Sequence, residues 1–333
     1  AAGTEDRSGW CWTGFRAFDD LERESCLRPF NSLEEDGIVL VGGGSSMGKS
    51  VLMRQLAGEE LLAGPNGPPV VIYSLETSVK GFVRQLAAAR AGVNLLALHR
   101  TPRDLLVKFR ECLEELRELA DKRLFIFQNE EGSEINTIEA LDRHARRFAA
   151  QHGVPKLMVV DYLQRLDTTK RYNSAEQRVA FVAHGFQALQ RSLGCCSIGG
   201  AQFNEEALKA MRTAKRDEDG KIIHAASMPT RGALRESQAL YHDCDVALFL
   251  YRPPEDSLGQ DQSDGTGLSP EMWIVQDKRR NGVLGACRTH FQKQFGRFRE
   301  IGAGAPAAPA ASTTAAVAPG AKVSSANFKS QKK

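Results

Sequence analysis

One stretch, residues 38–50, constrains the fold of this chain more than any other. An apolar run stops at three glycines, and from Gly43 the spacing G-x-x-x-x-G-K-S ends at Gly48, Lys49 and Ser50. The glycines let backbone N–H groups turn inward around a triphosphate, and the helical pattern that follows directs the positive end of its dipole at the same anion. Lys49 can reach the outer phosphates, and the Ser50 hydroxyl can ligate Mg²⁺. The stretch therefore predicts that the chain binds a nucleoside triphosphate.

The alternative is a glycine-rich turn that merely precedes a helix. The strand before it, the helix after it and the Lys-Ser pair in register all argue against that alternative. The nucleotide-binding residues that the motif predicts are Gly43, Gly44, Ser45, Ser46, Met47, Gly48, Lys49, Ser50 and Val51.

Composition places the chain among ordinary globular proteins. The 333 residues are 42% hydrophobic and 26% charged, and the net charge is only +3, so a nucleic-acid surface has to come from local basic clusters. The seven cysteines are odd in number and form no C-x-x-C pair, which argues against a disulfide framework and a zinc site. No apolar run approaches the length of a membrane span. We therefore expect a reduced compartment and no membrane partner.

Short apolar runs alternate with helical patterns along most of the chain. Buried strands are predicted at 38–41, 70–75, 124–127, 157–160, 196–199, 245–251 and 272–276, and helices at roughly 79–91, 102–121, 134–151 and 174–193. Asn281-Gly282 predicts a hairpin that pairs the last strand with 283–291. This order indicates an α/β fold with a doubly wound, mainly parallel sheet flanked by helices, and a phosphate site at the carboxyl ends of its strands.

Three segments of the chain differ in composition. Residues 1–36 are irregular, and we expect their aromatic residues to pack on the core. Residues 37–301 are expected to form the nucleotide-binding domain, in which 204–233 lacks periodicity and is predicted to be a long mobile loop. From Gly302 onward Ala, Pro, Ser and Thr dominate, so 302–333 is predicted to be a disordered tail.

Three side chains that can act on a triphosphate follow predicted strands. Asp161 ends one strand, where a Walker-B carboxylate holds Mg²⁺. Glu76 ends another, where it can polarise an attacking water, and Gln202 follows a third, where an amide can sense the γ-phosphate. Each also has a plainer interpretation. Asp161 can be a turn residue or helix cap, Glu76 a solvated carboxylate at the rim, and Gln202 an ordinary loop amide. The phosphate loop upstream favours the catalytic interpretation of Asp161.

Three basic clusters are candidates for contacts outside the phosphate loop. Residues 277–282, Asp-Lys-Arg-Arg-Asn-Gly, lie at the predicted hairpin tip, from which an arginine can reach the nucleotide of a neighbouring subunit. Residues 169–172 and 231–237 can bind a nucleic-acid backbone, although solvated surface charge explains them equally well. The second of these lies next to a basic loop with Lys209, Arg212, Lys215 and Arg216. Neither stretch interleaves aromatic residues, so phosphate contacts are favoured over base readout.

In this order, the motifs resemble the ATPase domain of DnaB-type replicative helicases, a RecA-like P-loop fold. The resemblance runs from about Thr13 to Phe298, and its most specific elements are Ser-Met-Gly-Lys-Ser (46–50), Ser-Leu-Glu (74–76), Asp-Tyr-Leu-Gln (161–164), Gln202 with Asn204, Leu-Arg-Glu-Ser (234–237) and Lys-Arg-Arg-Asn-Gly (278–282). It implies an ATP-driven helicase of DNA replication that moves 5′ to 3′ on single-stranded DNA as a homo-oligomeric, hexameric ring. ATP and Mg²⁺ are the implied cofactors, and a primase or helicase loader is a candidate partner. The implied location is the cytoplasm of a bacterium or phage-infected cell, with an organelle matrix as the alternative.

The resemblance also assigns roles to single residues. It makes Lys49 and Ser50 the phosphate and Mg²⁺ ligands, Glu76 the catalytic base, Asp161 the Walker-B acid and Gln202 the γ-phosphate sensor. Arg280 matches the family's arginine finger and Lys278 its accompanying basic residue, while Arg235 and Glu236 fall on the loop that grips the single strand. With the basic clusters, the predicted DNA-binding residues are Lys170, Arg171, Arg231, Arg235 and Glu236.

The sequence departs from the family pattern at three points. Gln238 replaces the glycine that follows Arg-Glu-Ser, and Gly44-Ser45 stand where bacterial members carry Arg-Pro. Nothing before residue 13 corresponds to the family's amino-terminal helical domain, which organises the ring and contacts primase. A nucleotide-gated scaffold or loader without productive unwinding is therefore the alternative function, and a strand-exchange recombinase is a weaker third. The intact catalytic set favours the motor.

Overall fold

The computed structural model describes residues 10–11, 13–19, 30–31, 37–62, 67–128, 135–212, 217, 228–253, 271–280 and 282–301. For Arg235, Glu236 and Ser237 it describes the backbone alone. All of these residues belong to the first of two compact units, Ala1–Ala303. The second unit, Gly304–Lys333, and with it the predicted tail at 302–333, lies outside the described residues.

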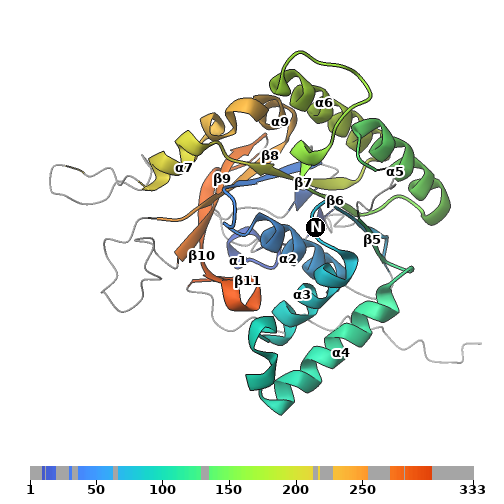
Figure 1. Ribbon diagram of the computed structural model, residues 1–333, viewed down its shortest axis with the longest axis vertical. Helices are drawn as coiled ribbons and strands as arrows, with labels where there is room; N and C mark the ends of the chain where they lie inside the picture. The colour runs from blue at the N-terminus through green and yellow to red at the C-terminus, as the bar shows by residue number, and fades with distance from the viewer. Residues whose placement is uncertain are drawn as a thin grey trace, which may run out of the picture. The chain divides into compact units, whose positions relative to one another are not determined.

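A nine-stranded mixed sheet forms the middle layer of the described part of the chain, with strand order β11-β10-β9-β8-β3-β7-β6-β4-β5 (Figure 1). The strands from β8 to β5 in this order run parallel, and β9, β10 and β11 continue the sheet as an antiparallel meander. The strands are β3 (Ile38–Gly43), β4 (Val70–Ser74), β5 (Leu124–Gln128), β6 (Leu157–Asp161), β7 (Cys196–Gln202), β8 (Val246–Tyr251), β9 (Glu271–Arg279), β10 (Gly285–Gln292) and β11 (Arg297–Glu300). The predicted α/β class and the predicted hairpin, here β9–β10, are both confirmed.

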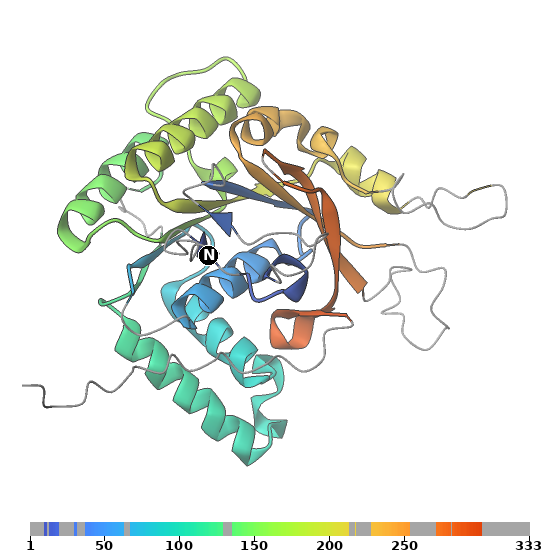
Figure 2. The ribbon, with the colours of Figure 1, turned by 180° about the vertical axis from the view of Figure 1, so that it is seen from behind.

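Helices cover both faces of this sheet, as Figures 1 and 2 show from opposite sides. The α-helices are α1 (Arg16–Asp19), α2 (Lys49–Leu62), α3 (Val79–Ala91), α4 (Arg103–Leu119), α5 (Ile138–His152), α6 (Ala175–Leu193), α7 (Glu205–Arg212) and α9 (Gln238–Asp243). The 3₁₀ helices are η2 (Leu95–Arg100), η3 (Leu163–Arg165), η4 (Arg231–Ser237) and η6 (Lys293–Phe295). Helices α2, α3 and α4 lie on one face, and α5, α6 and α9 lie on the other.

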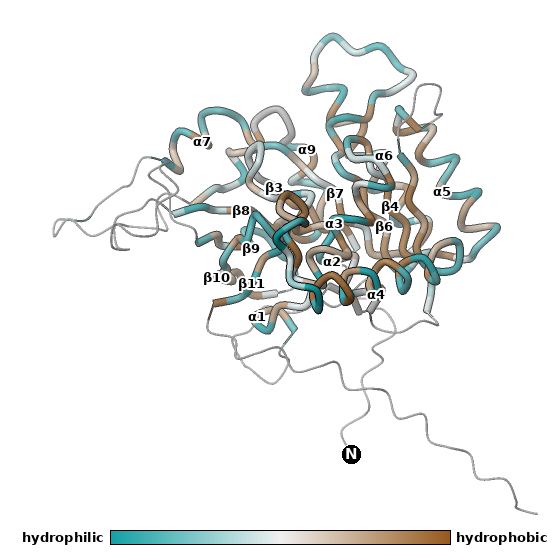
Figure 3. The backbone as a smooth tube through the Cα atoms, turned by 60° about the horizontal axis from the view of Figure 1, so that its bottom comes forward, coloured by the Kyte–Doolittle hydropathy of each residue, from teal (hydrophilic) through white to brown (hydrophobic). Residues whose placement is uncertain are grey.

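The alternation of side chains along the central strand explains why both faces are covered. Val39 and Val41 pack in the core cluster that contains α2, α3 and α4, whereas Ile38 and Leu40 pack in the cluster that contains α5, α6 and α9. Successive strand residues point to opposite faces, so a strand that is apolar at every position needs a layer on each side. Much of β4 and β6 is brown in Figure 3, while α5 is mostly teal, as expected for a helix with one exposed side.

Capping residues account for the good agreement between predicted and observed helix bounds. Ser78, Thr137 and Ser174 accept hydrogen bonds from backbone N–H groups in the first turns of α3, α5 and α6. Gly92 and Gly194 end α3 and α6 in the left-handed conformation, with φ of 70° and 68°. Both kinds of signal are local, and the sequence displays them directly.

The prediction of one long mobile loop at 204–233 is wrong for its two ends. Residues 205–212 form α7, because Asn204 Oδ1 accepts the Ala207 N–H at 2.8 Å and Met211 is buried in the core. The other end enters η4, which runs directly into α9. Most of the residues between them, including Lys215 and Arg216, lie outside the described part of the chain.

The amino-terminal segment is described only in part. A short ladder pairs β1 (Trp10–Cys11) with β2 (Phe30–Asn31), and Phe15 and Phe18 are buried in the core. Among the described residues, no helix combines the length and the apolar character that crossing a membrane requires.

Candidate functional site

The phosphate loop connects the carboxyl end of β3 to the first turn of α2, as its sequence requires. Ser46 and Gly48 take positive φ values of 61° and 97°, which turns the backbone sharply between the strand and the helix. A Cβ at Gly48 would also lie 2.9 Å from ring atoms of Phe291 and Phe298, so only glycine fits this position. The loop can therefore present its N–H groups to an anion.

Lys49 lies over this loop rather than away from it. Its Nζ donates to the carbonyl oxygens of Gly43 and Gly44, both at 2.9 Å. Burial lowers the pKa of the Lys49 ammonium, and the nearby carboxylates of Asp161 and Glu76 oppose this shift. The ammonium is thus held where the outer phosphates of a bound triphosphate would lie.

The register of the parallel strands brings the other predicted residues to the same edge of the sheet. Gly43 and Gln202 are direct partners in the β3–β7 pair, and Ser74 and Asp161 are direct partners in the β4–β6 pair. Glu76 follows the end of β4. The structure therefore places Gln202, Asp161 and Glu76 at the carboxyl edge that carries the phosphate loop, because parallel strands end on one side of a sheet.

Asp161 is a buried carboxylate with spare bonding capacity. Burial raises the pKa of Asp161 above its usual range, and a hydrogen bond from the Ser50 hydroxyl opposes this rise. Its Oδ1 is buried and has no hydrogen-bond partner among the described residues. A buried acceptor without a hydrogen-bond partner lowers the stability of the fold unless a ligand binds to it.

The Ser50 hydroxyl and the orphaned Asp161 oxygen fit a Mg²⁺ site. The described residues contain no cluster of three or more His, Cys, Asp or Glu side chains that could hold a metal ion by themselves. Mg²⁺ in nucleotide sites uses only one or two protein ligands and takes the rest from phosphates and water. A hydroxyl beside one free carboxylate oxygen is sufficient for such a site.

Glu76 pairs with a residue that the sequence reasoning did not single out. Arg165 lies 3.3 Å from Glu76 Oε1, and the two side chains are 54% and 40% exposed. Arg165 belongs to η3, directly after the Asp-Tyr-Leu-Gln motif, and this adjacency to a recognised motif is the only sequence signal for it.

Two further residues of this edge were missed. Gln164 joins η3 to β7, since its Oε1 accepts the Gln202 N–H at 2.7 Å and its Nε2 donates to the Gln202 carbonyl at 3.4 Å. Arg54 is buried in α2, with its guanidinium 5.7 Å from the centre of the Phe82 ring, and burial lowers its pKa to about 10. An arginine at a helical core position is a sequence signal for such a residue.

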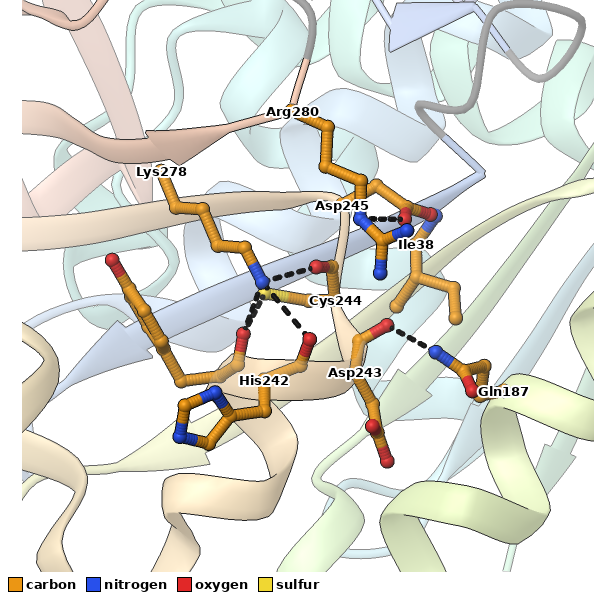
Figure 4. Close-up of polar contacts among 9 residues, drawn as sticks. Ile38, Gln187, His242, Asp243, Cys244, Asp245, Lys278 and Arg280 are labelled. Atoms are coloured by element: carbon orange, nitrogen blue, oxygen red, sulfur yellow. Dashed lines mark hydrogen bonds and ion pairs between the residues drawn. The ribbon is translucent and has the colours of Figure 1, made fainter.

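Arg280 and Lys278 are not part of this assembly. Arg280 follows the end of β9, where its Nε pairs with Asp245 Oδ1 at 3.0 Å (Figure 4). Lys278 Nζ donates to the carbonyls of Tyr241, His242 and Cys244 at 2.6, 3.0 and 2.7 Å. Because β9 runs antiparallel to β8, this strand end lies at the amino-terminal edge of the parallel strands. The structure thus separates these two residues from the phosphate loop of the same chain.

The candidate DNA-binding residues form two groups near α6. Lys170 and Tyr172 line a shallow cavity of about 290 Å³ before the amino terminus of α6, and Lys170 Nζ lies 4.6 Å above the Phe181 ring. Arg171, next in the chain, is exposed. Arg231 begins η4, which packs against α6, and Arg235 and Glu236 lie on the same short helix, where only their backbone is described.

Comparisons with known proteins agree with this architecture. A family model for the DnaB-like helicase C-terminal domain matches residues 13–300. The replicative DNA helicase DnaB of Haemophilus influenzae is 25% identical over 286 residues, or 85% of this chain and 54% of that protein. The DnaB of Pasteurella multocida is 26% identical over 285 residues, again 85% and 54%. The chain therefore spans about half the length of these curated relatives.

Solved structures show the same fold. An ATPase domain superposes with a TM-score of 0.66 at 19% identity, covering 88% of this chain and 93% of that one. A DnaB-like replicative helicase, studied with its interactions with primase, superposes with a TM-score of 0.63 at 20% identity, covering 80% and 59%. Both likenesses support the RecA-like fold expected from the sequence. With the family model spanning nearly all of the described residues, the chain belongs to the DnaB-like helicase C-terminal domain family.

Proposed function

We propose that residues 37–301 are the ATP-hydrolysing motor of a replicative ring helicase that translocates 5′ to 3′ on single-stranded DNA. One observation carries the proposal: the chain has the nucleotide-binding half of an ATPase site at one end of β3 and a candidate arginine finger at the other. Two copies, arranged head to tail, would each supply the half that the other lacks.

Because β3 is six residues long, Arg280 cannot reach the nucleotide-binding site of its own chain. Arg280 N–H donates to the Asp245 carbonyl, and Asp245 N–H donates to the carbonyl of Ile38, the first residue of β3. The phosphate loop follows Gly43, at the other end of this six-residue strand. At about 3.3 Å per residue the two ends are about 17 Å apart, which is more than an arginine side chain spans. Arg280 is therefore assigned to the nucleotide of a neighbouring subunit.

Each residue of the carboxyl edge has a role in this proposal. Lys49 and the loop N–H groups hold the phosphates, and Glu76 accepts the proton of the attacking water. Gln202 senses the γ-phosphate and is connected to the Walker-B segment through Gln164. Ser50 and Asp161 would hold a Mg²⁺ ion, which would neutralise negative charge on the phosphates. Arg280 of the neighbour neutralises the remaining charge as the phosphoryl group leaves.

The single strand is assigned to the basic groups beside α6. Lys170, Arg171 and Arg231 supply exposed or partly exposed cations, and Arg235 and Glu236 lie on η4. Binding through phosphates requires no base recognition, so a motor can move along any sequence. Because a solved relative interacts with primase, a primase or a helicase loader is the partner we expect for the assembled protein.

A forked-duplex unwinding assay tests the proposal, with particle size measured under the same ATP, Mg²⁺ and DNA conditions. We expect a ring-sized particle that separates the fork when a 5′ single-stranded arm is present, and no unwinding by the matched Lys49→Ala variant. ATP hydrolysis and DNA binding without strand separation would instead support a scaffold or loader. Full hydrolysis by a monomer would contradict the shared site.

A further inference from the structure

Asp245 contacts Arg280 in a way that leaves the end of the arginine free for another partner. The ion pair uses Nε, which lies 3.0 Å from Asp245 Oδ1, and the pair is only 11% exposed on the Asp245 side and 36% on the Arg280 side. The contact of this ion pair is made by Nε, and a guanidinium has further N–H donors at its terminal nitrogens for a second acceptor. Figure 4 shows one terminal nitrogen beside the Asp245 carboxylate and the other pointing away from it.

Asp245 is itself held rigidly. Its Oδ2 accepts the Ile38 N–H at 2.9 Å, and its own N–H donates to the Ile38 carbonyl at 2.9 Å. Both carboxylate oxygens are therefore used, one on the first residue of the central strand and one on Arg280. A carboxylate fixed at one oxygen to the sheet can hold an arginine at a fixed orientation with the other.

The strand end that carries Arg280 is also fixed to α9. Lys278 Nζ uses its three hydrogens on carbonyls at the end of that helix, and it lies 5.1 Å from the centre of the Tyr241 ring. These contacts anchor the backbone at Lys278, two residues before Arg280. Asp245 then sets the direction of the side chain that leaves this anchored backbone.

We propose that Asp245 is a positioning residue for Arg280: it holds Nε so that the terminal nitrogen pointing away from the carboxylate faces the γ-phosphate bound by the neighbouring subunit. A guanidinium can engage two acceptors at once, one through Nε and one through its terminal nitrogens, because its five N–H donors form a rigid planar fork. Asp245 acts through Arg280 and touches no substrate. The inference rests on the proposed role of Arg280 in the neighbour's site.

The test compares Asp245→Asn with Arg280→Ala in the assembled protein with DNA and Mg²⁺-ATP. Asparagine keeps the size and one acceptor oxygen for the Ile38 N–H, but removes the charge that holds Nε. We expect the maximal hydrolysis rate to fall by up to roughly a hundredfold, the cost of a catalytic group misplaced by about 1 Å. KM for ATP should stay unchanged, because the chain's own nucleotide pocket lies at the other end of β3.

Two combinations separate positioning from a general structural defect. Adding Asp245→Asn to Arg280→Ala should cause no further loss, since the residue has nothing left to position. Mixing Asp245→Asn with Glu76→Gln subunits should restore activity at interfaces that join an intact finger to an intact pocket, whereas mixing it with Arg280→Ala subunits should not. A wild-type rate for Asp245→Asn, or an equal further loss in the double variant, would overturn the inference.

The result also separates this inference from the proposed function. If Arg280→Ala hydrolyses ATP normally, the finger assignment fails; if Arg280→Ala is crippled and Asp245→Asn is not, only the positioning role fails. Thermal unfolding and particle size are measured for every variant. If Asp245→Asn does not fold, Arg280→Lys gives the second measurement. A lysine ammonium cannot contact Asp245 and a phosphate together in the way that a guanidinium can. Near wild-type activity in Arg280→Lys would therefore overturn the proposal.

Discussion

The two ends of β3 differ in how their charged side chains are satisfied. At the carboxyl end, Asp161 Oδ1 is buried without a hydrogen-bond partner among the described residues, and Lys49 is held only by carbonyls of the phosphate loop. At the amino end, Asp245 uses both oxygens and Lys278 donates three hydrogen bonds. The first end has bonding capacity left for a ligand. At the second end, the Asp245 carboxylate and the Lys278 ammonium fix the geometry around Arg280.

This contrast is what a shared active site requires of one subunit. A pocket must keep acceptors and donors available for phosphates and a metal ion, whereas a finger must hold its direction before the neighbour arrives. A buried oxygen without a hydrogen-bond partner lowers stability unless a ligand binds it, which is the situation of Asp161 Oδ1 at the carboxyl end. Changing either end should therefore lower ATP hydrolysis, and mixing the two kinds of variant should distinguish the ends.

The largest expected effect comes from the amino end. Arg280→Ala should lower ATP hydrolysis by about 10³ to 10⁵, the usual value of an arginine finger, while each subunit still binds nucleotide. Turnover and nucleotide binding are measured on the assembled protein. Mixing Arg280→Ala with Glu76→Gln subunits should restore part of the activity, and an inactive mixture despite demonstrated mixed particles would contradict action on the neighbour.

The carboxyl end gives the next largest effect. Glu76→Gln should keep ATP affinity but lower turnover by at least about a hundredfold, because the amide cannot accept the proton of the attacking water. Arg165→Gln is the matched control: its ion pair with Glu76 is half-exposed, so we expect a change of less than about fivefold. Turnover near wild type in Glu76→Gln would remove that residue from catalysis.

DNA binding should be affected by neither end of β3. If the residues beside α6 contact phosphates only, Arg171→Ala or Arg235→Ala should lower single-strand affinity roughly tenfold and reduce the salt slope by about 0.7 for each lost contact. Fluorescence anisotropy across a salt series measures both quantities. Strong preference for one DNA sequence would contradict backbone recognition, and Arg280→Ala serves as the control with unchanged affinity.

The smallest effect concerns Asp19, a partly buried carboxylate that lies at neither end. Burial raises the pKa of Asp19 to about 6, even though the Thr13 and Gly14 N–H groups donate to it. The folded protein therefore takes up a proton that the unfolded chain, with an ordinary carboxyl pKa near 4, does not. As the pH falls from 7 to 5, the unfolding free energy of the wild type relative to Asp19→Asn should rise by about 1 kcal/mol.

Denaturant unfolding of both proteins at the two pH values checks this prediction. ATP hydrolysis at neutral pH should be the same in both, because Asp19 is remote from the phosphate loop in sequence and its hydrogen bonds within the described part of the chain are to Thr13 and Gly14. If the difference in unfolding free energy between the two proteins were the same at both pH values, the pKa of Asp19 would not be raised. If a folded Asp19→Asn variant lost ATP hydrolysis, Asp19 would have a role in the reaction, contrary to this prediction.

Local signals in the sequence were enough to locate most elements of the fold. The caps at Ser78, Thr137 and Ser174 fix helix starts, and the apolar runs fix the buried strands. Helix α7 was missed because it is only eight residues long and opens a stretch rich in Lys, Arg, Asp and Gly, and the burial of Met211 depends on its packing against the core. Strand β11 was missed because three of its four residues, Arg297–Glu300, are charged, so the sequence shows no apolar run there. Its pairing with β10 is what makes it a strand.

The sequence by itself determined the phosphate loop with Lys49 and the order of most strands and helices, because these depend on neighbours a few positions away. It also marked Asp161, Glu76 and Gln202 as residues that follow strands, and the family resemblance gave them their predicted roles. Tertiary structure alone decided which side chains share an end of the sheet. The pairs Glu76–Arg165, Gln164–Gln202 and Asp245–Arg280 join residues far apart in the chain. Strand register and direction create these contacts, and no periodicity in the sequence encodes a register between strands separated by whole helices.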